Sequence, residues 1–248
     1  MTRESELSHL VSIAKDYHLG GSEDDMRIEA TVQKYDLRRI DRFIPDGSAV
    51  LEMGYGDGIT FSHLVRRTEY SLVEAVPGLV EVAKAKAASL RANVTFHEGL
   101  FEEFFPDRLY DVVLASHVLE HVVDPVETLR TIRSWLAPTG IVVAIVPNAE
   151  SIHRRLSVAA GLSNSIFDLS ARDRIVGHRR VYCMEELKQH FDQAGFKVTH
   201  ELGSFLKPLP NTQLLGLSDE SIALLCEASD LIEPKSLANL IFVATPNS

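Results

Sequence analysis

Between residues 48 and 146, the chain alternates short apolar segments with longer segments whose apolar residues recur at helical spacing. The helical segments read "ITFSHLVRR", "PGLVEVAKAKAASL" and "DPVETLRTIRSWLA", and the last two carry a proline in the first turn. This alternation indicates parallel strands joined by crossover helices. We therefore predict an α/β fold. The five strand-like segments are 48–53, 70–75, 93–97, 110–115 and 140–146.

Beyond these segments, the chain adds one helix and two more strands. The helix "MEELKQHFDQAG" is closed by Gly195, and strands are predicted at 196–202 and 237–245. The links 148–182 and 203–236 are longer than ordinary loops, so we expect substrate-side insertions with short helices. Residues 1–43 are predicted to form a helical cover over the substrate opening beside these two insertions. With 248 residues and 45% hydrophobic content, we expect a single domain spanning 1–248.

Charge and composition exclude several classes of function. A net charge of −10 opposes binding to a phosphate backbone, so no nucleic-acid partner is expected. The sequence has no uncharged apolar stretch of about 18 residues, and its first residues lack the pattern of a secretory signal. We expect a cytoplasmic protein without a membrane partner, and a homodimer is compatible with the sequence. Cys183 and Cys226 lie far apart without metal-ligand spacing, so they are interpreted as reduced thiols.

A glycine-rich turn, "LEMGYGDGIT", joins the first predicted strand to the first helix. Gly54, Gly56 and Gly58 would let a ligand approach the backbone at a helix N-terminus, as in nicotinamide, flavin and S-adenosylmethionine sites. Glu52, two residues before the turn, suits a cationic amino group and would repel a pyrophosphate. Glu74, at the end of the second strand, can accept hydrogen bonds from both ribose hydroxyls. An adenosyl amino acid satisfies both acids.

Four segments in register resemble the class I S-adenosylmethionine-dependent methyltransferases, in their bacterial small-molecule subgroup. They are "VLEMGYGDG", "LVEAVPGLVEVAK", "YDVVLASHVLEHVVDP" and "WLAPTGIVVAIVPN". The resemblance covers roughly residues 48 to 148 and, more loosely, the last two strands. It implies S-adenosylmethionine as cofactor. It also implies a seven-stranded, mostly parallel Rossmann-like sheet of order 3-2-1-4-5-7-6, with an antiparallel final strand and helices on both faces.

The resemblance also implies a set of cofactor-binding residues around the ends of the first four strands. One position departs from the family pattern, because many relatives place an acid after the glycine that follows the third strand, to meet the adenine amino group. Here that residue is Leu100, so the adenine contacts are expected to be apolar or from backbone. The implied residues are Glu52, Gly54, Tyr55, Gly56, Glu74, Ala75, Gly99, Leu100, Phe101, Ser116 and His117.

The segment "SHVLEHV" contains two histidines four residues apart. If the segment were helical, His117 and His121 would share one face and superficially resemble a metal pair. Glu120 would lie on another face, and no further acid is spaced to complete a coordination set. We therefore predict no metal and interpret His121 as structural. His117 is a candidate to contact the substrate or to form the wall beneath the cofactor.

Six arginines fall between residues 154 and 180 of an otherwise acidic chain, at 154, 155, 172, 174, 179 and 180. They could bind a phosphate or carboxylate, although a solvated face explains isolated arginines equally well. The units "GHRRVY" and "FLKPLPN" resemble segments of bacterial methyltransferases often met in polysaccharide and natural-product pathways; the second could also be a rigid surface loop. The predicted substrate-binding residues are Tyr17, Asn148, Arg179, Arg180, Tyr182, Lys207 and Asn211.

The predicted reaction is direct displacement, in which an acceptor atom attacks the sulfonium methyl group. A general base is needed only for an acceptor that must lose a proton, and His178 and His117 are the candidates. We predict a small anionic acceptor, such as a sugar nucleotide or a natural-product intermediate. Two alternatives are a methyltransferase-like partner that binds the cofactor without catalysis and a nicotinamide-dependent oxidoreductase. Glu52 before the glycines disfavours the second.

Overall fold

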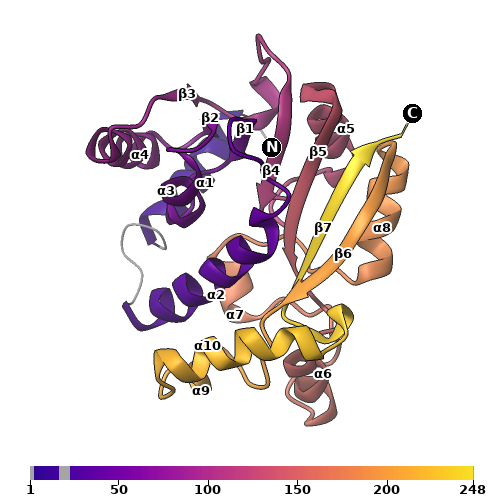
Figure 1. The fold of residues 1–248 in the computed structure, drawn as a ribbon. Coiled ribbons are helices and arrows are strands. Elements are labelled where there is room, and N and C mark those ends of the chain that lie inside the picture. The colour runs from indigo at the N-terminus through magenta and orange to yellow at the C-terminus, as the bar shows by residue number, and fades with distance from the viewer. Residues whose placement is uncertain (1–2, 17–22, 248) are drawn as a thin grey trace.

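The protein is built around one seven-stranded sheet. The computed structural model describes residues 3–16 and 23–247, with side chains described for residues 7–14 and from residue 27 onward. Within these residues the strand order is β3-β2-β1-β4-β5-β7-β6, as predicted (Figure 1). The strands are β1 (Ala49–Met53), β2 (Glu69–Glu74), β3 (Val94–Glu98), β4 (Tyr110–Ser116), β5 (Leu136–Pro147), β6 (Phe196–Ser204) and β7 (Asn239–Pro246).

Strand pairing places β1 and β4 next to each other in the middle of the sheet. β1 pairs in parallel with both β2 and β4, and β4 pairs in parallel with β5. β7 is antiparallel to both β5 and β6, which confirms the predicted antiparallel final strand. The connections run outward in opposite directions from β1 and β4. In open α/β sheets, ligands bind beyond the carboxyl ends of the strands at such a switch point.

The predicted helices form with the expected start and stop signals. Asp124 caps helix α5 by accepting a hydrogen bond from the backbone N–H of Glu127, and Pro125 occupies the first helical position. Gly195 follows α8 in the left-handed conformation, at φ 80°. The described α-helices are α1 (Arg3–Asp16), α2 (Glu23–Asp41), α3 (Ile59–Leu64), α4 (Pro77–Leu90), α5 (Pro125–Trp135), α6 (Ile152–Ala159), α7 (Ala171–Ile175), α8 (Met184–Gln193), α9 (Asn211–Leu214) and α10 (Asp219–Glu227).

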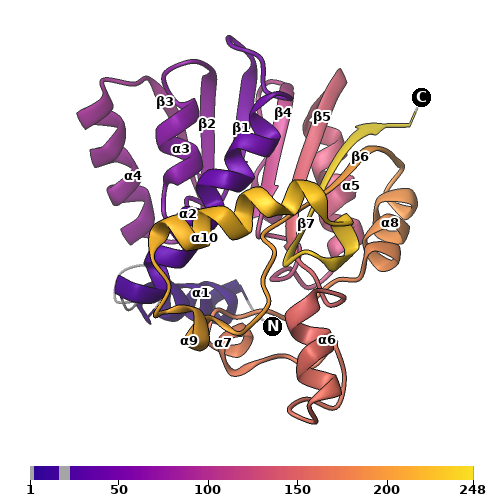
Figure 2. The same ribbon diagram turned by 60° about the horizontal axis from the view of Figure 1, so that its bottom comes forward.

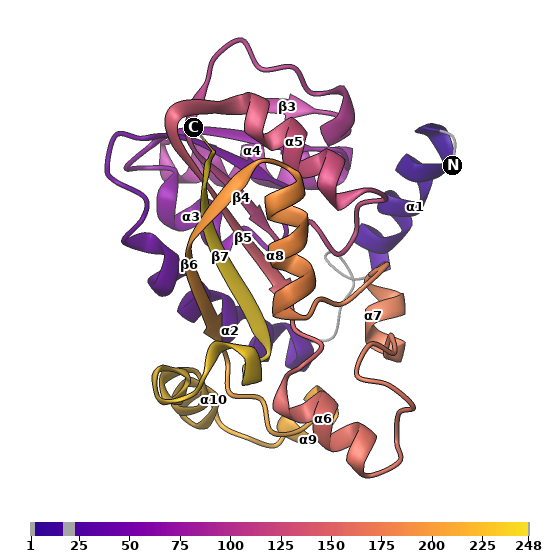
Figure 3. The ribbon, with the colours of Figure 1, turned by 90° about the vertical axis from the view of Figure 1, so that its right-hand side faces the viewer.

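Helices cover both faces of the sheet, so the central strands are apolar on both sides. On one face, Trp135 of α5 and Phe191 of α8 pack into a core with Phe242 of β7. On the other face, α2, α3 and α4 bury residues such as Phe61 and Leu79. Figure 3 shows α5 and α8 on the same side of the sheet, with α2 and α3 on the opposite side.

Helices α1, α6, α7 and α9, together called the cover below, lie at one end of the sheet. Figure 2 shows α1, α6, α7 and α9 gathered there, and in Figure 3 the arrowheads of β4 and β5 point toward that end. Residues 148–182 contain α6 and α7, whereas 203–236 contain α9 and α10. α2 and α10 pack through a separate apolar cluster that includes Ile28 and Ile222. None of the described helices combines the length and apolar composition needed to cross a lipid bilayer.

Candidate functional site

A large cavity lies between the carboxyl ends of the central strands and the cover. Its volume is about 1130 Å³. Pockets for one drug-sized ligand usually measure about 300–1,000 Å³, so the cavity has room for a cofactor and a second small molecule. Its walls come from the glycine turn, the ends of β2 and β4, helices α1 and α2, and the two long links.

The glycine turn after β1 forms one wall, and its backbone conformation requires glycine. Gly54, Gly56 and Gly58 have φ values of 80°, 56° and 72°, in a region that residues with a Cβ seldom adopt. A Cβ added at Gly54 or Gly56 would meet no described heavy atom within 4 Å. The backbone at these two positions therefore borders open space, as expected of a turn that a ligand approaches closely.

Glu74 lines the cavity at the end of β2 and is held by backbone donors. The N–H of Tyr55 donates to Oε2 at 2.9 Å, and the N–H of Val76 donates to Oε1 at 2.7 Å. Burial raises the pKa of Glu74, and these backbone bonds partly oppose the rise. Each carboxylate oxygen has a second lone pair, so Glu74 is prepared to accept two hydroxyl groups.

Glu52 also lines the cavity, one strand away, and only 5% of its surface is exposed. The Tyr70 hydroxyl donates to Oε2 at 2.7 Å. Burial raises the pKa of Glu52 to about 8, because the charged form loses its water. A cationic amino group bound beside it would favour the ionised form. The position of Glu52 is therefore compatible with the predicted contact to the methionine end of the cofactor.

The remaining predicted cofactor residues lie mostly on the same walls. Tyr55, Ala75, Leu100, Phe101 and Ser116 line the cavity. Gly99 is not among the lining residues, and its N–H donates to the Glu74 carbonyl oxygen at 3.0 Å. Several acids in the lining were not named from the sequence, and one of them, Asp57, lies within the quoted glycine turn.

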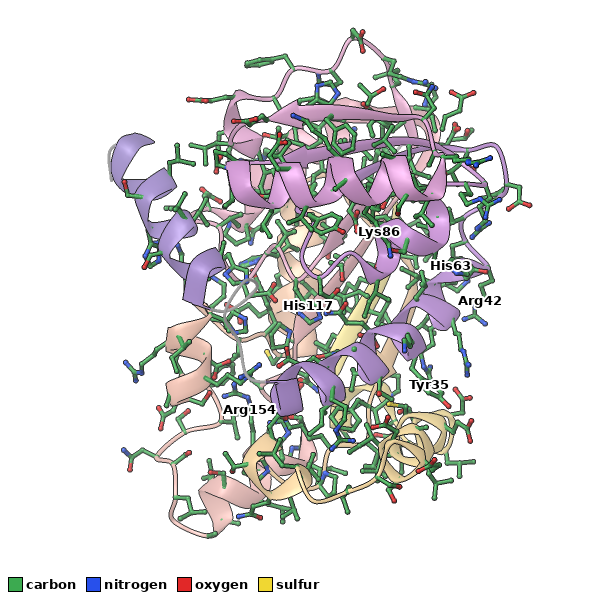
Figure 4. All side chains as sticks on the ribbon, turned by 90° about the vertical axis from the view of Figure 1, so that its left-hand side faces the viewer. Tyr35, Arg42, His63, Lys86, His117 and Arg154 are labelled. Atoms are coloured by element: carbon green, nitrogen blue, oxygen red, sulfur yellow. The ribbon has the colours of Figure 1, made fainter. Side chains whose placement is uncertain are left out.

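The segment after β4 differs from the helix considered from sequence, because residues 117–123 form a series of turns. His117 has φ 55°, which is strained for a residue with a Cβ and ends the strand without starting a helix. The turns bring Glu120 back to His117, with Nδ1 and Oε1 3.0 Å apart. Burial lowers the pKa of His117, but the hydrogen bond and charge of Glu120 outweigh it and raise the pKa to about 9. His117 lies near the centre of Figure 4.

His178 reaches the cavity from the cover and is oriented by an acid. Its Nδ1 lies 2.9 Å from Oδ1 of Asp173, and its Nε2 lies 3.9 Å from Oε1 of Glu120. Burial alone would raise the pKa of Asp173, but hydrogen bonds from His178 and Ser170 and the charge of Arg154 hold it well below its ordinary value. In Figure 4, Arg154 lies below His117. The signal for Asp173 in the sequence is the capping pattern "SARD", which starts α7.

Four predicted substrate residues support the wall from behind. Arg179 Nε donates to the His121 carbonyl at 2.6 Å, and Arg180 donates to the carbonyls of residues 119, 122 and 123. The Tyr182 hydroxyl donates to the carbonyl of residue 119, and the Asn148 amide donates to those of residues 235 and 237. None of the four lines the cavity. Tyr17 lies outside the described residues.

Lys207 and Asn211, the other two predicted substrate residues, line the cavity. Burial lowers the pKa of Lys207 to about 8, and among the described residues its ammonium has neither a hydrogen-bond partner nor an ion-pair partner. Two further cations in the lining are paired, Arg154 with Asp173 and Arg172 with Glu29. Of these three cations, Lys207 is therefore the one that the described residues leave available to a ligand.

The family model for the methyltransferase domain matches residues 28–201 of this chain. The chain belongs to this family. Membership confirms the predicted family, and with it the predicted cofactor, S-adenosylmethionine. The seven-stranded sheet agrees with the fold expected of a methyltransferase.

Curated relatives of this methyltransferase share part of its length. The malonyl-[acyl-carrier protein] O-methyltransferase of Halalkalibacterium halodurans is 30% identical over 102 residues, which are 38% of this chain and 37% of the relative. The ubiquinone biosynthesis O-methyltransferase of Azorhizobium caulinodans is 28% identical over 168 residues, which are 66% of this chain and 64% of the relative. Each match thus spans less than two thirds of the relative.

Among solved structures, the DhpI-SAM-HEP complex shares the fold of this methyltransferase. The TM-score is 0.60 with 19% sequence identity, and the alignment covers 98% of this chain and 97% of that chain. At this identity the likeness concerns the fold alone. The cytoplasmic location, the homodimer and the division into domain, cover and insertions stay predictions.

Proposed function

We propose that this methyltransferase transfers the methyl group of S-adenosylmethionine to a small anionic acceptor. The observation that carries the proposal is the division of one cavity into two chemically different halves. Glu52, Glu74 and the glycine turn form a half suited to an adenosyl amino acid, and Lys207 and His178 lie in the half below the cover. The two curated relatives are named for O-methylation in ubiquinone biosynthesis and of a carrier-bound malonyl group, which supports an oxygen acceptor.

In this reaction, an acceptor oxygen attacks the methyl carbon in line, the carbon–sulfur bond breaks, and S-adenosylhomocysteine leaves. Holding the two reactants in a near-attack geometry can supply about 7–11 kcal/mol. A hydroxyl acceptor also loses a proton, and His178 is the better base for it. His117 is the poorer base, because its pKa of about 9 keeps it protonated at neutral pH. The Nδ1–Asp173 contact leaves Nε2 of His178 to accept the proton.

The acceptor half combines charge with apolar surface. Ile13, Ile28 and Val32 from the N-terminal helices line it together with Phe205, whereas Lys207 supplies the charge. An acceptor with an apolar body and one carboxylate or phosphate group would satisfy both. Arg179 and Arg180 are not assigned to the acceptor, because neither lines the cavity and both donate to backbone carbonyls of the 117–123 turns.

The proposed activity is tested by incubating the chain with methyl-labelled S-adenosylmethionine and a panel of nucleotide sugars, keto acids and phenolic carboxylates. We expect label in at least one anionic acceptor, together with equimolar S-adenosylhomocysteine. The control is the His178→Ala variant on the same panel. A chain that binds the cofactor but labels none of these acceptors would favour the alternative of a binding partner without catalysis.

Replacing Lys207 by methionine is expected to raise KM for an anionic acceptor by about 10- to 100-fold, since a hydrogen bond to a charged group contributes about 1.5–3 kcal/mol. In the unsubstituted chain, KM should rise as the pH passes about 8, where the buried ammonium loses its proton. The variant should lose this pH dependence and keep its affinity for S-adenosylmethionine. Steady-state kinetics between pH 6.5 and 9.5 measures both effects.

The matched control for Lys207 is Lys197→Met, which removes an exposed lysine from the edge strand β6. It should leave KM and its pH profile unchanged. If the best acceptor is neutral and Lys207→Met has the kinetics of the unsubstituted chain, the anionic acceptor is the wrong substrate class.

A further inference from the structure

Three side chains that could bind a metal ion converge at the wall of the cavity. Glu120 and His121 come from the turns after β4, and His178 comes from the segment after α7. One ligand atom from each residue lies within 4.8 Å of the others. The fold therefore joins residues more than fifty positions apart into one carboxylate and two imidazoles, a set that the helix considered from sequence, and with it the prediction of no metal, did not include.

In both histidines the ring nitrogen Nδ1 already contacts an acceptor outside this cluster. Nδ1 of His178 lies 2.9 Å from Oδ1 of Asp173, and Nδ1 of His121 lies 3.3 Å from the Gly177 carbonyl oxygen. An N–H at Nδ1 satisfies both acceptors and leaves the Nε2 lone pair free. Metal-binding histidines are commonly oriented in this way, by donating their other ring N–H to a carboxylate or carbonyl.

Glu120 supplies a second and independent indication of a ligand. Its side chain is fully buried, and its Oε2 has no hydrogen-bond partner among the described residues. Oε1 already contacts His117. A buried carboxylate oxygen without a partner is costly, and a cation bound between the carboxylate and the two imidazoles would provide that partner.

The cluster is also accessible from the cavity. His121 and His178 both line it, whereas Glu120 lies behind them. An ion held by all three residues would keep coordination positions open toward the half of the cavity assigned to the acceptor. A set of two histidines and one glutamate with an open position is a known arrangement for catalytic zinc.

We propose that Glu120, His121 and His178 form a binding site for a divalent transition-metal ion of the zinc class, open toward the acceptor half of the cavity. The inference goes beyond the proposed methyl transfer and does not rest on it, since the site is defined by metal binding alone. The Nε2 lone pair of His178 cannot hold an ion and accept a proton at once. The proposed base function of His178 therefore applies to the metal-free protein.

The test uses the full, untagged chain after treatment with a chelator. Titration with Co²⁺ should give one ion per chain with a visible absorption spectrum of nitrogen and oxygen ligation, and Zn²⁺ should displace it. His121→Ala and His178→Ala should each lower Zn²⁺ affinity at least tenfold, because even the loss of an orienting partner costs 10- to 100-fold. Asp173→Asn leaves all three ligands in place and should weaken binding by about that factor.

The matched control is His200→Ala. It removes an exposed histidine of β6 that packs against Phe43 and does not line the cavity. It should bind Zn²⁺ as the unsubstituted chain does. Circular dichroism checks that each variant is folded. If a variant that lacks one of the ligands does not fold, the metal affinity of Asp173→Asn still tests the assignment. If the unsubstituted chain binds no Co²⁺ or Zn²⁺, or if His121→Ala, His178→Ala and Asp173→Asn bind as His200→Ala does, the assignment is wrong. Affinity for S-adenosylmethionine, measured separately, tests the proposed function without reference to the metal.

Discussion

Replacing Glu74 by alanine is expected to weaken S-adenosylmethionine binding by about 10²- to 10⁴-fold. The carboxylate is fixed by the backbone N–H groups of Tyr55 and Val76, and its remaining lone pairs are available to the two ribose hydroxyls. Each hydrogen bond to a charged group contributes about 1.5–3 kcal/mol, so two contribute about 3–6 kcal/mol, and every 1.4 kcal/mol is about tenfold in affinity. Titration calorimetry measures the dissociation constant directly.

Glu69→Ala is the matched control for Glu74→Ala, because it removes an exposed glutamate from the opposite end of the same strand. It should leave cofactor affinity unchanged. Glu74→Gln keeps the shape of the side chain but turns one acceptor into a donor, so we expect an intermediate loss. Because the alanine variant also leaves two backbone N–H groups without their acceptor, thermal unfolding is recorded alongside. An unchanged dissociation constant in a folded Glu74→Ala variant would remove Glu74 from the cofactor site.

The cofactor half could be predicted from sequence because its geometry is local. Glu52 and Gly54 are separated by one residue along one strand end, and Glu74 follows at the end of the adjacent strand. Parallel pairing places these ends at the same edge of the sheet, so strand assignment was enough to bring the two acids together. The replacement of the family's usual acid by Leu100 could also be recognised in the sequence, and the Leu100 side chain lines the cavity.

The acceptor half could not be predicted to the same degree, because it depends on contacts between distant segments. His117 was considered as part of a helix, but its positive φ starts a series of turns whose carbonyl groups accept hydrogen bonds from other segments. Arg179 and Arg180 donate to those carbonyls and so lie outside the cavity lining. Arginine patterns in a sequence carry no information on which acceptor the guanidinium will meet. Lys207 was named from the resemblance of the "FLKPLPN" segment to bacterial methyltransferases, and only the fold shows that it lines the cavity where Arg179 and Arg180 do not.

His178→Ala is expected to lower turnover of a hydroxyl acceptor by about 10²- to 10⁴-fold, the usual contribution of a positioned general base. The reaction is measured on chelator-treated protein, in which the Nε2 lone pair is free to accept the proton. Affinity for S-adenosylmethionine should be unchanged, since the cofactor half lies on Glu52, Glu74 and the glycine turn. Asp173→Asn should lower turnover by a smaller factor, because it removes the group that orients the ring but keeps the base.

A structural role for His178 would also lower turnover, so the decisive measurement is rescue by a free base. The side chain is partly accessible from a cavity of about 1130 Å³, and alanine at this position would leave room for a small molecule. Added imidazole should therefore restore part of the turnover of His178→Ala, because it can occupy the vacated space and accept the same proton. Imidazole should not raise the turnover of Asp173→Asn, because the His178 side chain still fills that space. Loss of turnover in His178→Ala without any rescue by imidazole would contradict proton transfer and leave His178 as a residue that positions the wall.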